Sequence, residues 1–237
     1  MTVEQPDPLR SETKDEREEK KTRPTGVADF PDFAKRRKSF WSLQASPEEI
    51  QIELTRKLLH LLIAFVPTLL SFSREWTIAA LAAGTSAYAL FEYLRMHGKR
   101  VPLVSSITEK AARKRDSGKF VKGPITLGLG ALCSVLLFSP EAASIAIYIL
   151  AFGDGFSSLV GKTIGHIKLP LTRGKSLEGS ITCFALSFLS ALLVSWRPGP
   201  ALVIALCSTV TEAWPTKDWD NIILPLMAGL TATLFGI

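Results

Sequence analysis

The sequence predicts an all-α membrane protein, a helical bundle of about seven transmembrane helices that follows a hydrophilic N-terminal extension. Of its 237 residues 47% are hydrophobic and the mean hydropathy is +0.22, although the chain carries 28 Lys and Arg and 22 Asp and Glu. These charges are segregated into the first 57 residues and a few short stretches, whereas a soluble domain spreads them along every amphipathic element. Several apolar blocks approach the ~20 residues that a helix needs to cross a bilayer.

Residues 1–49 form the first of two predicted domains, a hydrophilic cytoplasmic extension. Residues 1–28 are poor in hydrophobic side chains and rich in mixed charge, which is typical of disordered segments. In segment 30–43 the basic run KRRK lies between phenylalanine and tryptophan residues, and this pattern favours a segment lying on an anionic membrane surface. Nucleic acid attracts the same charges, but no folded reading module accompanies them, so we expect no nucleic-acid partner.

The second predicted domain, residues 50–237, contains the apolar blocks and all the candidate catalytic residues. Three blocks are short, and we expect their ends to lie in the interface or inside the bundle. Cys133, Cys183 and Cys207 each fall within an apolar block at spacings that match no zinc motif, so they are predicted to be packing residues. The predicted spans are, in chain order, about 54–72, 76–94, 124–140, 142–162, 179–196, 200–214 and 221–237.

The distribution of positive charge predicts the orientation. With seven spans, every Lys and Arg except Arg74 and Arg197 falls on the same side of the membrane. Lys and Arg are enriched in cytoplasmic loops. We therefore expect an integral, multi-pass membrane protein whose N-terminus is cytoplasmic and whose C-terminus lies on the opposite side.

Polar residues at the cytoplasmic edges of the first two spans are the first candidates for a site. Arg56 and His60 stand one helical turn apart, and His60 lies too deep to reach the headgroups. Both are predicted to bind substrate, while Lys57 is interpreted as a headgroup anchor. Glu92 and Arg95 end the second span one turn apart, and they form either a structural ion pair or part of the same site.

Asp154 is the central candidate because it lies at the end of the apolar run AASIAIYIL. A carboxylate in a membrane span costs a few kcal/mol even on lenient scales, and such residues usually mark an ion or substrate site. Its neighbours Gly153 and Gly155 let other groups approach closely. The string GDGFSSLVGKT resembles a phosphate-binding P-loop, but it has five residues between Gly155 and Gly161 where that loop needs four. Lys162 remains a candidate cation for a nucleotide.

The loop LTRGKSLEGS supplies cations, a hydroxyl and glycines, a composition suited to phosphate oxygens. It predicts Lys175 and Glu178 as catalytic residues together with Asp154, and either Asp154 or Glu178 is the expected proton acceptor. The same loop also predicts a group of substrate- or nucleotide-binding residues: Arg173, Ser176 and Gly179.

The third cluster, TEAWPTKDWDN, contains Glu212, Asp220 and Asn221 at the ends of the last two spans. Asp220 suits a helix cap. Oxygen donors of this kind also suit a hydrated Mg²⁺ ion, and together with Asp154 they are the predicted metal ligands. In the predicted topology all three clusters converge on the cytoplasmic half, between cytosolic nucleotide and membrane lipid.

These segments resemble the CTP-dependent lipid-alcohol kinases, which include dolichol and polyprenol kinases, phytol kinase and CTP-dependent diacylglycerol kinase. That family is related in pattern to the phosphatidate cytidylyltransferases. The resemblance spans about residues 50–237 and implies that Asp154, Lys175, Ser176, Gly179, Asp220 and Asn221 belong to a site for CTP and Mg²⁺. The resembling segments are RKLLH (56–60), FEYLR (91–95), GDGFSSLVGKTIGHIK (153–168), GKSLEGS (174–180) and DNIILP (220–225).

The expected reaction is transfer of the γ-phosphoryl group of CTP to the hydroxyl of a lipid alcohol such as a polyprenol, phytol or diacylglycerol. The alternative within the same family pattern is a phosphatidate cytidylyltransferase that makes CDP-diacylglycerol. A small transporter with Asp154 as an ion site is a third reading, but the chain has no convincing inverted repeat of the kind that transporters often show.

Overall fold

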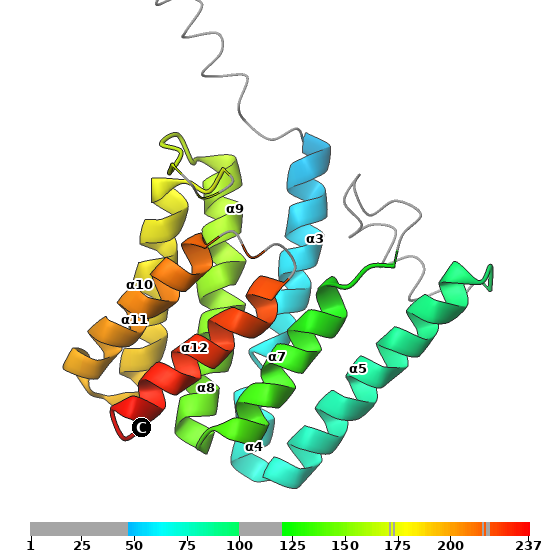
Figure 1. Cartoon of the computed structure of the whole chain (residues 1–237), viewed down its shortest axis with the longest axis horizontal. Helices are drawn as coiled ribbons and strands as arrows, with labels where there is room; N and C mark the ends of the chain where they lie inside the picture. Colours follow the sequence, from blue (N-terminus) through cyan, green and yellow to red (C-terminus); the bar gives the residue numbers. More distant parts are fainter. Residues whose placement is uncertain (1–46, 100–119, 171, 173, 215, 217–218) are drawn as a thin grey trace, which may run out of the picture. The chain divides into compact units, whose positions relative to one another are not determined.

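The computed structural model describes residues 47–99, 120–170, 172, 174–214, 216 and 219–237 (Figure 1). The interfacial segment predicted at 30–43 lies outside these ranges. Within them the chain is helical apart from short connections, which confirms the all-α prediction.

The first two predicted spans correspond to α3 (Pro47–Ile63), α4 (Val66–Phe72) and α5 (Arg74–Met96). Helix α3 begins well before the predicted position 54. A turn separates α3 from α4, and Pro67 stands in the first turn of α4, where a missing N–H costs nothing. Ser73 caps α5 by accepting a hydrogen bond from the backbone of Trp76 at 3.4 Å.

The third and fourth predicted spans correspond to α7 (Gly123–Leu137) and to one continuous rod. This rod consists of α8 (Pro140–Tyr148), the π-helical turn η2 (Ile149–Asp154) and α9 (Gly155–Thr163). A π-helical turn is rare and concentrates at functional sites. Asp154 is its last residue.

The last three predicted spans correspond to α10 (Leu177–Ser195), α11 (Pro198–Ala213) and α12 (Asp220–Leu234). The described helices thus group into seven rods, which match the predicted blocks in order. Three segments are long and apolar enough to cross a membrane, namely Ile50–Phe72, Pro140–Thr163 and Leu177–Ser195, while α7 and α12 are apolar but shorter. These helices are the evidence for membrane association, and the number of seven membrane-crossing helices stays a prediction.

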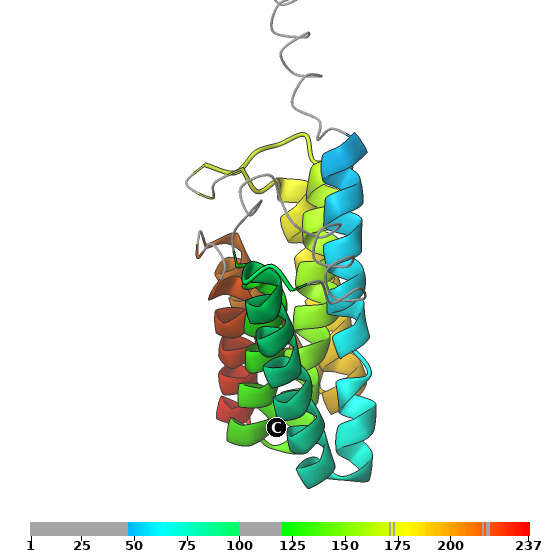
Figure 2. The same ribbon diagram turned by 90° about the vertical axis from the view of Figure 1, so that its right-hand side faces the viewer.

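The α8–η2–α9 rod packs between α3 and α10 (Figures 1 and 2). Its residues Ile145, Ala146 and Ile149 are fully buried in the bundle. Large apolar side chains elsewhere face outward, among them Phe72, Leu193 and Leu234. An apolar interior combined with an apolar exterior is the arrangement expected of helices in lipid.

Helix ends gather at one end of the bundle. The N-terminal part of α3, the end of α9 and the start of α10 lie together there, and the C-terminal residue lies at the other end (Figures 1 and 2). The helix ends that meet in this way carry polar residues that were identified from the sequence as site candidates (Figure 1).

Candidate active site

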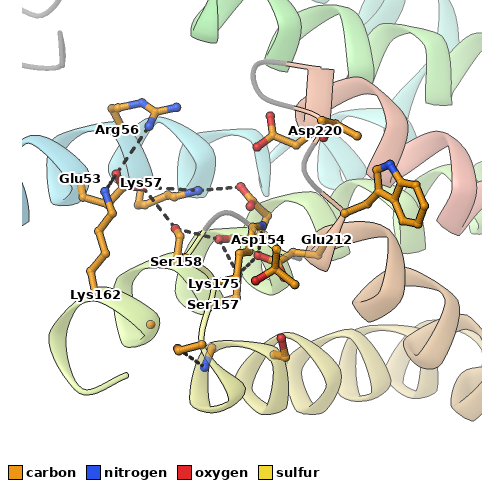
Figure 3. A pocket seen from close by; sticks show the side chains of 18 of the residues that line it. Glu53, Arg56, Lys57, Asp154, Ser157, Ser158, Lys162, Lys175, Glu212 and Asp220 are labelled. Carbon is orange, nitrogen blue, oxygen red and sulfur yellow. Dashed lines mark hydrogen bonds and ion pairs between the residues drawn. The ribbon is translucent and has the colours of Figure 1, made fainter. Parts of the chain in front are cut away.

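A cavity of about 440 Å³ opens among the helix ends described above (Figure 3). Helices α3, α9, α10, α11 and α12 and the loop before α10 all contribute residues to its wall. Serine, threonine and glycine residues fill the spaces between the charged side chains. The charged residues that line the cavity are Glu53, Arg56, Lys57, Asp154, Lys162, Lys175, Glu212 and Asp220.

Asp154 faces two residues of α3. Its Oδ2 atom lies 2.6 Å from Lys57 Nζ (Figure 3). The same Oδ2 atom lies 3.2 Å from His60 Nδ1, and only 3% of Asp154 is exposed. His60 Nδ1 also lies 3.5 Å from the carbonyl oxygen of Leu150. His60 does not line the cavity, so it reaches the site through Asp154 rather than directly.

Lys57 is a site residue that the sequence reasoning missed by treating it as a headgroup anchor. It is 6% exposed and lies inside the bundle. A usable signal was present, because Glu53, Lys57 and His60 follow an i, i+4, i+7 spacing and therefore share one face of α3. A charged face on an otherwise apolar helix indicates a partner inside the bundle.

Lys175 and Glu212 form a second ion pair across the cavity, between the loop before α10 and the end of α11. Ser157 Oγ donates to the same Glu212 oxygen, Oε1, at 3.1 Å. Burial alone lowers the pKa of the Lys175 ammonium, but Glu212, and beyond it Asp154 and Asp220, raise that pKa above its usual value. Lys175 therefore stays cationic.

Ser176 and Glu178 hold the loop in place. Ser176 Oγ accepts from Gly179 N at 3.2 Å and caps α10. The Glu178 carboxylate accepts from the backbone N–H groups of His166 at 2.8 Å and Ile167 at 3.2 Å, and Glu178 does not line the cavity. This placement gives Glu178 a structural contact and favours Asp154 as the reacting acid. Arg173 lies outside the described residues.

Oxygen atoms that suit Mg²⁺ are present in the cavity wall. Asn221 Nδ2 donates to Thr126 Oγ1 at 2.9 Å and to Gly123 O at 3.3 Å, which leaves Oδ1 for a partner in the cavity. Within the described part of the chain, Glu212 Oε2 is buried and has no hydrogen-bond partner. Together with Asp154 and Asp220, these atoms form a carboxylate and amide donor set.

This donor set fits an ion that shares its coordination with a substrate. In the described ranges, no three His, Cys, Asp or Glu side chains are close enough to hold a metal by themselves. Mg²⁺ is usually bound by one or two carboxylates, several waters and substrate phosphates rather than by a complete protein cage. The residues present fit that pattern.

Glu92 and Arg95 lie apart from the cavity wall. Glu92 is fully buried, and it accepts from Arg95 at 2.7 and 2.8 Å and from Val121 N at 2.8 Å. Of the two readings of this pair, the contacts favour the structural one, because Glu92 ties α5 to the segment that leads into α7.

Gly179 allows α9 and α10 to approach closely, which brings their polar residues to the same cavity. A Cβ atom at Gly179 would lie 2.7 Å from Ser157 O and 3.4 Å from Gly161 Cα. We therefore expect Gly179→Ala to lower the free energy of unfolding by about 1–3 kcal/mol. Thermal unfolding in detergent measures this effect.

Gly155→Ala is the matched control, since Gly155 is also a helical glycine but a Cβ there meets nothing within 4 Å. It should leave the stability unchanged or raise it by up to ~1 kcal/mol. Equal losses at the two positions would contradict the close packing of α9 on α10.

Known proteins that are similar to this chain are named as kinases. No family model and no solved structure matches the chain. The probable chloroplastic phytol kinase of Zea mays is 31% identical over 205 residues, which cover 78% of this chain and 67% of that protein. The corresponding protein of Triticum aestivum is 31% identical over 211 residues, covering 79% and 69%.

A fungal protein extends the comparison to a second lipid substrate. The CTP-dependent diacylglycerol kinase 1 of Eremothecium gossypii is 27% identical over 209 residues, covering 75% of this chain and 65% of that protein. All of these relatives are named as kinases, which favours an enzyme over a transporter. The chain belongs to the family of CTP-dependent lipid kinases that the motif resemblance predicted, and it is a lipid kinase.

Proposed function

We propose that the chain transfers the γ-phosphoryl group of CTP to the hydroxyl of a membrane lipid alcohol at the cytoplasmic surface. The observation that carries the proposal is the cavity, where buried Asp154 and the cations Lys57 and Lys175 meet at the end of a bundle of apolar helices. The name of the diacylglycerol kinase supports CTP as the donor. The names of both kinds of relative support a lipid hydroxyl as the acceptor.

The cations that line the cavity can stabilise the negative charge on the phosphate oxygens during phosphoryl transfer. Lys57, Lys175, Lys162 and Arg56 all line the space in which we place the CTP phosphates. In such reactions catalysis is almost entirely positioning and electrostatic stabilisation of the phosphoryl oxygens. Ser176 and Gly179, at the start of α10, complete the proposed phosphate-binding wall.

In the proposed reaction the lipid oxygen forms a bond to the γ-phosphorus while the bond from that phosphorus to the β–γ bridging oxygen breaks. The products are the lipid phosphate and CDP. The hydroxyl proton passes to Asp154, because Glu178 is turned toward the backbone of the loop. Oxygens of Asp220 and Asn221, with the carboxylate of Glu212 or of Asp154, would hold Mg²⁺, which supplies neutralisation of phosphate charge when bound.

The orientation of the bundle is part of the proposal. The cavity lies at the end of the bundle where α3 begins and α9 ends (Figure 1). In the sequence, the stretches next to these helix ends are rich in Lys and Arg, and the positive-inside tendency makes that end cytoplasmic. A nucleotide then reaches the cavity from the cytosol, while the lipid reaches it from the membrane.

Labelled CTP tests the function directly. Purified full-length protein is incubated with Mg²⁺, a panel of polyprenol, phytol and diacylglycerol, and CTP that carries its label at either the γ- or the α-phosphate. We expect the γ-label, but not the α-label, to enter one of the lipids. If phosphatidate instead becomes α-labelled CDP-diacylglycerol and the γ-label leaves in pyrophosphate, the chain is a cytidylyltransferase.

A further inference from the structure

Glu53 is a nearly fully buried carboxylate on α3 that lines the cavity, and neither the motif resemblance nor the proposed reaction gives it a role. Only 1% of the residue is exposed. A charge so deeply buried in an apolar bundle is costly unless several partners compensate it. The groups that contact the Glu53 carboxylate therefore indicate its role.

Among the described residues, the Glu53 carboxylate contacts three cations and one hydroxyl. Its Oε2 atom lies 2.5 Å from Lys162 Nζ and 3.5 Å from Arg56 NH1, and its Oε1 atom lies 3.9 Å from Lys57 Nζ (Figure 3). Ser158 Oγ donates to Oε1 at 3.3 Å. The three cations come from two helices, α3 and α9, and all of them line the cavity.

We infer that Glu53 is a positioning residue that orders Lys57, Lys162 and Arg56 along one wall of the cavity so that their charges face the transferring phosphoryl group. This inference rests on the proposed function. A phosphoryl group needs cations at fixed positions, and a misplacement of about 1 Å costs on the order of a hundredfold in rate. Long lysine side chains hold such positions only when a second group restrains them.

Glu53 also sets the charge balance of the cavity. The described lining residues carry equal numbers of carboxylates and cations, namely Glu53, Asp154, Glu212 and Asp220 against Arg56, Lys57, Lys162 and Lys175. Removing the Glu53 charge leaves an excess positive charge, which attracts nucleotide phosphates more strongly. Removing the Glu53 charge should therefore slow turnover, because the cations lose their fixed positions, and should strengthen CTP binding, because the cavity becomes more positive.

The test is Glu53→Gln in the full-length protein, with kcat measured for lipid phosphorylation and the dissociation constant of CTP measured by calorimetry in the presence of Mg²⁺. We expect kcat to fall by roughly tenfold or more, because the cations lose their restraint. The dissociation constant should fall by roughly threefold, because the cavity gains positive charge. A merely structural role would not produce slower turnover together with tighter binding per folded molecule.

Glu53→Asp separates charge from geometry. It keeps the negative charge but shortens the side chain, so we expect the wild-type dissociation constant with a reduced kcat. Glu92→Gln is the matched control, since Glu92 is as deeply buried and pairs with Arg95 at 2.7 Å but does not line the cavity. That variant should lower the unfolding temperature and leave both kcat and the dissociation constant unchanged.

Several outcomes overturn the inference. A Glu53→Gln variant that turns over within twofold of the wild-type rate, or that binds CTP more weakly, contradicts it. If Glu53→Gln does not fold, Glu53→Asp decides the matter, and a wild-type kcat in that variant rules the positioning role out. Failure of the proposed function is recognised separately, because wild-type protein would then phosphorylate none of the lipid alcohols.

Discussion

Asp154→Asn is expected to abolish lipid phosphorylation, with a loss of at least about 10²–10⁴-fold in kcat. The substitution removes the proposed proton acceptor. It also removes the charge that holds Lys57 Nζ at 2.6 Å and His60 Nδ1 at 3.2 Å. The variant therefore loses the proton acceptor and the fixed position of the Lys57 cation at the same time. The rate is measured with γ-labelled CTP at saturating lipid.

The stability of this variant has to be measured with its activity. Removing a charge from a membrane segment lowers the cost of insertion. However, breaking the buried ion pair leaves Lys57 with only the more distant Glu53 carboxylate, whose Oε1 atom lies 3.9 Å away, and breaking such a pair costs up to about 3–5 kcal/mol. The double variant Asp154→Asn with Lys57→Met removes both charges, so it should recover most of the unfolding temperature while remaining inactive.

This pair of variants separates chemistry from folding. Folded Asp154→Asn protein with activity within tenfold of the wild type would remove Asp154 from the reacting groups. Recovery of activity in the double variant would show that the loss came from the unpaired Lys57 rather than from the missing carboxylate.

Much of the fold could be predicted because long apolar blocks separated by polar stretches specify helices and their order. The interruptions of the α-helix within two of the rods were not predicted. The turn between α3 and α4 has a local signal in Pro67, which the reading of 54–72 as one span passed over. The π-helical turn that ends at Asp154 depends on how neighbouring helices pack and has no strong local signal. Membrane crossing is supported for three segments by length and hydropathy, since the other helices are shorter or less apolar.

The site residues could be predicted from the sequence where a charged residue stands in an otherwise apolar segment. Asp154, in an apolar run, is the clearest case, and Glu212 and Asp220 also line the cavity with it. Lys57 and Glu53 were missed because their partners are distant in sequence: Asp154, at the end of η2, by 97 residues, and Lys162, on α9, by 109. The catalytic role of Glu178 stays a prediction, and its carboxylate accepts hydrogen bonds from the backbone of His166 and Ile167, in the connection that follows α9.

Lys175→Met is expected to be far more damaging than Lys162→Met, although both lysines line the cavity. Lys175 pairs with buried Glu212, and the charges of Asp154 and Asp220 also act on it. It therefore lies among the acids that we assign to the reaction. Losing a group that stabilises the transferring charge usually costs about 10²–10³-fold in kcat.

Lys162 should matter less for a geometric reason. Its side chain is 37% exposed, against 27% for Lys175, and it pairs with Glu53 at 2.5 Å rather than with the acids around Asp154. The sequence predicted Lys162 as a candidate cation for a nucleotide, and the structure places it in the wall of the cavity. Because Arg56 lies beside the same carboxylate, the wall keeps a cation in Lys162→Met. We expect a loss of roughly tenfold or less.

The comparison requires kcat at saturating CTP and lipid for both variants, with the folded fraction taken from the stoichiometry of CTP binding. Lys175→Arg serves as the charge-preserving control and should recover part of the rate, since a guanidinium can still bind phosphate oxygens. A larger loss at Lys162 than at Lys175 would move the transferring phosphoryl group toward the end of α9. The pair between Lys175 and Glu212 would then serve to hold the loop before α10 against α11, and Lys175 would no longer be assigned to the γ-phosphate.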